Sequence, residues 1–129
     1  MDRDDAMDLL KEYTKNPNLI KHALAVEAAM RAYARKLDGD EETWAIIGLL
    51  HDFDYEKYPD MEDHPFKGAE ILRERGWSEE VVEGVLAHAP HTDETRDTDM
   101  KRAIFAVDEL TVLIVATALV HPNGLEDVR

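Results

Sequence analysis

The stretch AIIGLLHDF, residues 45–53, joins an apolar segment to a polar pair at its end. Asp40 and the acidic residues that follow it stand where a helix is capped and its first turn is favoured, so an α-helix over residues 41–53 is predicted. Consecutive helical residues point about 100° apart, so His51 and Asp52 cannot easily face one site from mid-helix. We therefore expect the helix to fray there and the backbone to turn both side chains inward. Gly48 is expected to let another helix approach closely.

Helical signals cover most of the remaining chain. Caps, apolar residues at helical spacing, and Gly or Pro terminators predict five further helices. These are one ending near Thr14 and capped by Asp4 or Asp5, and others over residues 16–37, 65–75, 79–89 and 99–119, the last ended by Pro122 and Gly124. Neither a strand of useful length nor an internal repeat is evident. The sequence predicts an all-α fold, a single domain over residues 1–129 built as a compact bundle of about six helices.

The composition limits the kinds of partner. The chain carries a formal net charge of −14, which argues against binding to a nucleic-acid backbone or an anionic membrane. A small anionic substrate requires a cation in its pocket, and a bound metal ion would suffice. There is no cysteine, so a metal would need nitrogen and oxygen ligands. No apolar run approaches the ~20 residues of a membrane span, and the N-terminus lacks the layout of a secretory signal. A cytoplasmic location is expected, and the oligomeric state is open.

Six polar residues stand beside or within apolar helical segments. They are His22, His51, Asp52, His64, His88 and Asp108. Taken singly, a histidine on an apolar helix is more often a hydrogen-bonded core residue than a ligand, and an aspartate can face solvent. Asp108 is harder to explain in this way, because an unpaired buried carboxylate costs several kcal/mol. Together, imidazole nitrogens and carboxylate oxygens on one core suit a transition-metal site.

The order of these residues, with GLLHD, HPFKGAEIL and AVDEL around them, resembles the HD-domain superfamily of metal-dependent phosphohydrolases. The resemblance covers about residues 19–113 and implies an all-helical fold. It is closest to small, single-domain members related to the HDIG subgroup, whose name spells His-Asp-Ile-Gly. Residues 51–54 of this chain instead read His-Asp-Phe-Asp.

The resemblance implies a metal-ligand set. One ion would be held by His22, His51, Asp52 and Asp108. Members with two metals use two further histidines, here His64 and His88, with the aspartate of the pair as a bridge. Both histidines are present, so we prefer a binuclear centre to a mononuclear one. Iron, manganese, nickel, cobalt and zinc suit these ligands, and magnesium is also compatible.

The implied chemistry is hydrolysis of a small phosphorylated compound such as a nucleotide, a phosphomonoester or phosphodiester. A metal-bound water can ionise near neutral pH and attack phosphorus, and Asp52 would orient it as a catalytic residue. Lys67 and His91 are candidates for binding the substrate phosphate, although an ordinary surface role is somewhat more common for such residues. His121 is expected to be unrelated to the site.

Two other functions are compatible with the same residues. Some relatives use the same ligand pattern in a di-iron oxygenase, and the six ligands alone do not distinguish it from a hydrolase. A non-catalytic, ligand-sensing HD domain is the alternative from another class. The intact ligand set weighs against it, because a purely structural role needs no open metal site.

Overall fold

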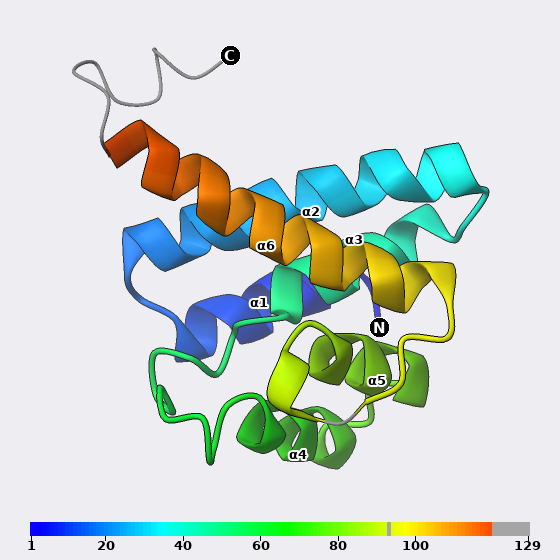
Figure 1. Cartoon of the computed structure of the whole chain (residues 1–129). Helices are drawn as coiled ribbons and strands as arrows, with labels where there is room; N and C mark the ends of the chain where they lie inside the picture. The colour runs from blue at the N-terminus through cyan, green and yellow to red at the C-terminus, as the bar shows by residue number, and fades with distance from the viewer. Residues whose placement is uncertain (93, 120–129) are drawn as a thin grey trace.

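The computed structural model describes residues 1–92 and 94–119, and this part of the chain is helical without any strand (Figure 1). Its elements are α1 (Arg3–Tyr13), α2 (Pro17–Leu37), α3 (Glu41–Leu50), α4 (Phe66–Glu74), α5 (Glu79–Ala87), a short 3-10 helix η1 (Pro90–Thr92) and α6 (Asp99–Leu119). The prediction of an all-α fold of about six helices is confirmed. Among the described helices, none combines the length and the apolar character that crossing a membrane requires.

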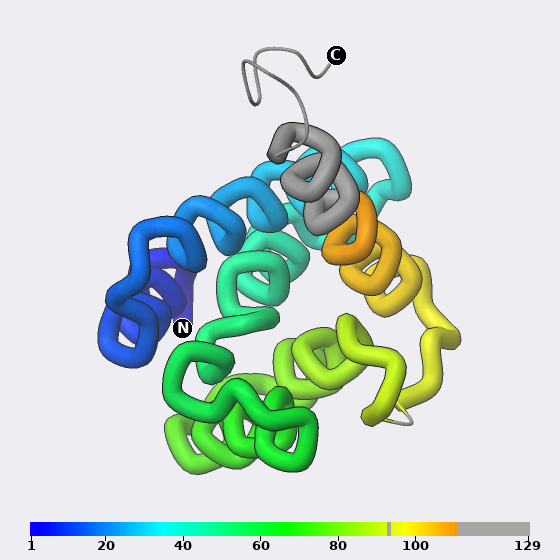
Figure 2. Tube along the Cα trace, turned by 60° about the vertical axis from the view of Figure 1, so that its left-hand side comes forward, coloured from blue at the N-terminus to red at the C-terminus, as the bar shows by residue number. Residues whose placement is uncertain are grey.

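Helix α3 forms the centre of the bundle. Every residue from Trp44 to Leu50 is buried, and α3 contacts α1, α2, α5 and α6. Figure 2 shows the other helices arranged around it. The contact with α2 is close at Gly48, where an added Cβ would lie 3.0 Å from the Cα of Glu27 and from the carbonyl oxygen of Val26. The expected close approach at Gly48 is thus confirmed.

The chain leaves the helix at the His-Asp pair. Helix α3 ends at Leu50, with His51 as its C-cap, so the helix predicted through Phe53 is three residues too long. The amide of Phe53 bonds the carbonyl of Leu50 at 3.2 Å, and the amide of Tyr55 bonds that of Asp52 at 3.0 Å. These three-residue steps are tighter than α-helical ones. They carry both polar residues out of the helix, as expected.

Helix α1 begins earlier than the sequence suggested. Asp2, and not Asp4 or Asp5, is its N-cap. The Asp2 side chain accepts a hydrogen bond from the amide of Asp5 at 3.0 Å, and the Asp5 side chain accepts one from the amide of Asp2 at 2.9 Å. This reciprocal pair satisfies two backbone donors at once, which a single cap at Asp4 or Asp5 would not do.

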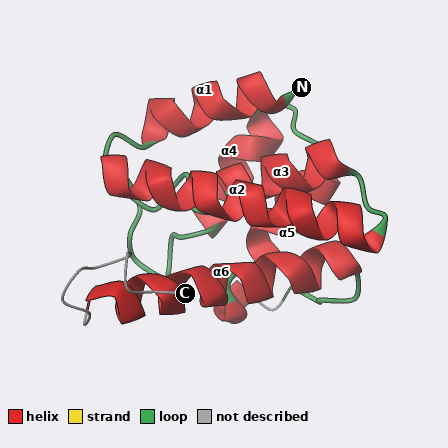
Figure 3. Cartoon of the chain, turned by 90° about the horizontal axis from the view of Figure 1, so that it is seen from above, coloured by secondary structure: helices red, strands yellow, loops and turns green. Residues whose placement is uncertain are grey.

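The remaining boundaries agree closely with the sequence patterns. Ser78 caps α5 through the amide of Val81, and Gly76 takes a φ of 83° in the turn between α4 and α5. Helix α6 spans Asp99–Leu119 as predicted and packs against α2 and α5. Viewed from above, α6 lies beside α2 (Figure 3), and in Figure 1 the two helices cross at an angle. The 3-10 helix η1 was not predicted. Pro122, Gly124 and His121 lie outside the described residues.

Candidate metal centre

Five chain segments bring the six predicted ligands together. They are α2 with His22, the end of α3 with His51 and Asp52, the loop before α4 with His64, the end of α5 with His88, and the middle of α6 with Asp108. The six residues divide into two groups that share Asp52. The first group is His22, His51, Asp52 and Asp108, and the second group is Asp52, His64 and His88. Within each group the ligand atoms lie within 4.8 Å of one another.

The first group is built around the carboxylate of Asp108. Its Oδ1 lies 3.2 Å from Nε2 of His22 and 3.1 Å from Nε2 of His51. The two Nε2 atoms are 3.1 Å apart. Oδ2 of Asp52 completes this group, 3.6 Å from Nε2 of His22 and 3.4 Å from Nε2 of His51. Two imidazoles and two carboxylates therefore converge from α2, α6 and the turn that follows α3.

The second group uses the other oxygen of Asp52. Its Oδ1 lies 3.1 Å from Nε2 of His64 and 3.1 Å from Nε2 of His88. One carboxylate thus presents Oδ2 to the first group and Oδ1 to the second. This is the arrangement expected of a ligand that bridges two ions.

Backbone carbonyls orient two of the histidines. Nδ1 of His51 lies 2.6 Å from the carbonyl oxygen of Gly48, and Nδ1 of His88 lies 2.5 Å from that of Val85. A carbonyl only accepts, so each Nδ1 carries the proton and each Nε2 is left to act as the acceptor in the neutral ring. This is the tautomer that metal binding through Nε2 requires.

A third histidine, His64, is held by a carboxylate that the sequence pattern did not identify as part of the site. Asp54 is fully buried, and its Oδ1 lies 2.6 Å from Nδ1 of His64. Its Oδ2 accepts a hydrogen bond from the amide of Gly68 at 2.9 Å. Position 54 departs from the HDIG pattern, and this departure was the available signal. Its partners, however, lie 10 and 14 residues further along the chain.

Burial and charge compete over the protonation of the histidines. Burial alone would lower the pKa of His51, but the carboxylates of Asp52 and Asp108 outweigh it and place this pKa well above the ordinary value. Burial alone would also lower the pKa of His64, but hydrogen bonds to Asp52 and Asp54 raise this pKa to about 9. In the metal-free protein these carboxylates therefore hold protons on the imidazoles. A divalent cation must displace those protons in order to bind.

The same balance acts on the two aspartates in reverse. Burial alone would raise the pKa of Asp52, but His51 and the other histidines lower it well below the ordinary value. Hydrogen bonds from His22 and His51 likewise outweigh burial at Asp108 and lower its pKa. The side chains of Asp52 and Asp108 are thus ionised carboxylates at neutral pH, which is the form that binds a metal ion.

The two residues predicted to bind phosphate have different surroundings. Lys67 is 45% exposed on α4, and its ammonium lies 3.7 Å from the carboxylate of Glu70. His91 lies beside the second group, with Nε2 2.8 Å from the carbonyl oxygen of His64 and its ring against that of Phe66. That hydrogen bond leaves Nδ1 of His91 for any further contact. Binding of phosphate by either residue stays a prediction.

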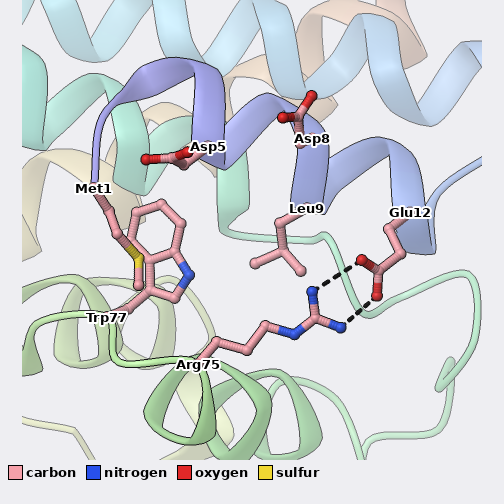
Figure 4. A pocket seen from close by; sticks show the side chains of 7 residues that line it. All are labelled: Met1, Asp5, Asp8, Leu9, Glu12, Arg75 and Trp77. Atoms are coloured by element: carbon pink, nitrogen blue, oxygen red, sulfur yellow. Dashed lines mark hydrogen bonds and ion pairs between the residues drawn. The ribbon is translucent and has the colours of Figure 1, made fainter.

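A surface recess lies at the side of α1, and none of its lining residues belongs to the two groups (Figure 4). It has a volume of about 290 Å³ and is lined by the acidic residues Asp5, Asp8 and Glu12. Its cation, Arg75, is paired with the carboxylate of Glu12. The acidic lining makes this recess unsuited to a phosphate group.

The comparison with known families agrees with the fold. The family model described as "HD domain" matches residues 19–113, a stretch that contains all six predicted ligands. No solved structure matches the chain significantly. The match covers most of the chain, and the all-helical fold agrees with it. The chain therefore belongs to the HD domain family.

Proposed function

We propose that this chain is a metal-dependent phosphohydrolase that cleaves a phosphomonoester or phosphodiester of a small molecule such as a nucleotide. The observation that carries the proposal is the shared carboxylate of Asp52, with its Oδ2 facing the first group and its Oδ1 facing the second. Two divalent ions suit these two groups, and iron, manganese, nickel, cobalt and zinc all suit the donor atoms. Magnesium is also compatible with the carboxylates.

Bound divalent ions would activate water for attack and polarise the phosphoryl oxygen. The chain's own part is to place the ligands and to control access. His51 and His88 are almost completely buried, with side chains 0% and 4% exposed. Asp52, His22 and Asp108 keep 24%, 17% and 19% of their side chains exposed. The cluster is thus anchored in the core on one side and reachable by a small substrate on the other.

The charge of the protein supports a metal-dependent reaction. The chain has a formal net charge of −14, so a phosphate ester would be repelled by most of the surface. The two groups together contain two carboxylates, Asp52 and Asp108. Two divalent ions would leave the centre net positive and attractive to phosphate. Lys67 and His91 are proposed to assist in holding that phosphate.

A di-iron oxygenase is the second candidate, because two groups that share one carboxylate also fit two iron ions. The candidates differ in what they consume. A hydrolase turns over phosphate esters with redox-inert metals such as zinc, whereas an oxygenase requires iron and consumes dioxygen.

The test is hydrolysis of an aryl phosphate by chelator-stripped protein, with each candidate metal added back singly. We expect no activity in the stripped protein and recovery with at least one divalent metal. Rates should rise with pH as water in the centre ionises. Glu27→Gln serves as a control, because it removes a buried carboxylate outside both groups. Activity that survives complete metal removal would contradict the proposal, and dioxygen uptake by the iron-loaded protein without phosphatase activity would favour the oxygenase.

A further inference from the structure

We propose that Asp54 is a positioning residue that holds His64 for metal binding and so sets the affinity of the second group for its ion. The inference rests on the proposed metal-binding role of His64. In the described side-chain hydrogen bonds, His64 is the one member of the two groups that Asp54 contacts.

The contacts of Asp54 define what it can do. A carboxylate only accepts hydrogen bonds, so the 2.6 Å contact with Oδ1 requires the proton to lie on Nδ1 of His64. Nε2 of the same ring then points to Oδ1 of Asp52, 3.1 Å away, on the side of the second group. Asp54 thereby fixes both the tautomer and the direction of the ring.

The other buried histidines show why His64 needs such a partner. His51 and His88 close helices, and each bonds the carbonyl three residues earlier in its own helix. His64 instead lies in the loop between α3 and α4. Asp54 supplies the missing acceptor, and it adds a negative charge that a backbone carbonyl lacks. The second group contains one carboxylate, which it shares with the first group. An added negative charge beside His64 therefore has its largest relative effect on the second group.

The start of α4 is shaped to receive Asp54. Pro65 at the N-cap makes no side-chain hydrogen bond, and Oδ2 of Asp54 accepts one from the amide of Gly68. A Cβ at Gly68 would lie 2.9 Å from Cγ and Oδ2 of Asp54. Only glycine leaves room for the carboxylate in this position. The competing explanation is that Asp54 merely caps α4, and the experiment must separate the two roles.

Asp54→Asn makes this separation. An amide keeps the size of the side chain and one oxygen acceptor. Because the amide has a single oxygen, it cannot accept hydrogen bonds from the Gly68 amide and from Nδ1 of His64 through separate oxygens. It also lacks the negative charge of the carboxylate. The measurement is calorimetric titration of chelator-stripped protein with Co²⁺, together with the visible spectrum of the bound ion. We expect wild type to bind two equivalents. In Asp54→Asn one equivalent should keep its affinity and the other should weaken about 10- to 100-fold.

Thr14→Val is the matched control for a lost hydrogen bond in the same turn. Thr14 is buried and donates to the carbonyl of Phe53 at 3.0 Å, next to Asp54 but away from His64. This variant should have a lower melting temperature and bind both Co²⁺ equivalents normally. Gly68→Ala keeps the carboxylate of Asp54 but must shift it from its position. This variant should selectively weaken the binding of the second Co²⁺ equivalent. It carries the test if Asp54→Asn fails to fold.

Normal binding of both equivalents by folded Asp54→Asn would overturn the inference and leave Asp54 as a cap of α4. The proposed phosphohydrolase would survive that result. Wild type that saturates at one equivalent, unaffected by His64→Ala, would overturn both the inference and the binuclear centre. The aryl phosphate assay would then decide separately whether the proposed function holds.

Discussion

Two charged clusters, each with a residue on α2, differ in the source of the positive charge that balances their carboxylates: Glu27 belongs to one and His22 to the other. Glu27 is 6% exposed, and the chain supplies its cations. Arg3 binds it through two nitrogens at 2.7 and 2.9 Å, and Arg31 binds it at 3.3 Å. Asp52 and Asp108 face only imidazoles in the described ion pairs. Their positive charge must come from solution, as protons on the histidines or as metal ions.

The difference separates a structural cluster from a candidate functional one. An arginine is protonated at all ordinary pH values, so the cluster of Glu27 is complete once the chain has folded. An imidazole changes its charge near neutral pH and binds metals when neutral. The cluster of Asp52 and Asp108 therefore depends on the pH and on the metal supply.

The largest effect is expected from Asp52→Ala. The substitution removes the oxygens that face both groups, so both ions should bind more weakly and hydrolysis should fall by at least about 100-fold. Asp108→Ala should weaken mainly the ion of the first group, and His64→Ala should remove one equivalent. Metal stoichiometry and aryl phosphate turnover check all three variants. Two equivalents bound with wild-type affinity by Asp52→Ala would contradict the shared role of this carboxylate.

Metal removal should change how stability depends on pH. Without metal, the raised pKa values of His51 and His64 contribute stability that is fully present below about pH 6.5. This contribution is lost as the pH rises through the folded values, about 9 for His64. The lowered pKa values of Asp52 and Asp108 contribute stability that is present above pH 3.8, the ordinary pKa of an aspartate, and is lost as the pH falls through the lowered values.

In the metal-bound protein the imidazoles are neutral ligands, so the loss at alkaline pH should disappear. At a free metal concentration about 100 times the Kd, one ion should add about 2.7 kcal/mol to the free energy of unfolding. The melting temperatures of stripped and loaded protein should therefore diverge between pH 6 and 9. Parallel curves over that range would show that the histidines do not exchange protons for metal.

Glu27→Gln should produce an intermediate effect on stability alone. The lost charge-assisted hydrogen bonds should lower the free energy of unfolding by about 1.5 kcal/mol. The value lies near the lower end for such bonds because Arg3 and Arg31 are about one third exposed and can regain water. Denaturant unfolding measures the change, and metal titration of the same variant should match wild type. A loss of metal binding here would break the contrast between the two clusters.

Lys67→Ala should have the smallest effect. Its ion pair with Glu70 is exposed, so the free energy of unfolding should change by less than about 0.5 kcal/mol. If Lys67 holds the substrate phosphate, KM should rise while metal stoichiometry stays unchanged. Arg102→Ala is the control, because Arg102 is an exposed cation paired with Asp99. Equal KM values for both variants and wild type would remove Lys67 from the site.

Several features of the fold could be predicted because they depend on near neighbours in the sequence. The cap at Ser78 and the turn at Gly76 act over a few residues. Asp108 could be identified because a carboxylate within an apolar helix is anomalous by itself. The cap of α1 was misplaced, because several aspartates near Asp2 can each accept a backbone amide and the local pattern does not choose between them.

The sequence by itself determined the helices, the donor types and the family resemblance. Only the tertiary structure decided how the donors divide into two groups and which oxygen of Asp52 faces each group. His22 and His51 meet Asp108 across 86 and 57 positions of the chain, because α6 packs along α2 at the end of α3. Only the tertiary structure revealed the contacts of Asp54. Its hydrogen bonds to His64 and Gly68 form where the start of α4 folds back onto the end of α3. Side-chain direction at a helix end or in a loop depends on such packing, and no local pattern encodes it.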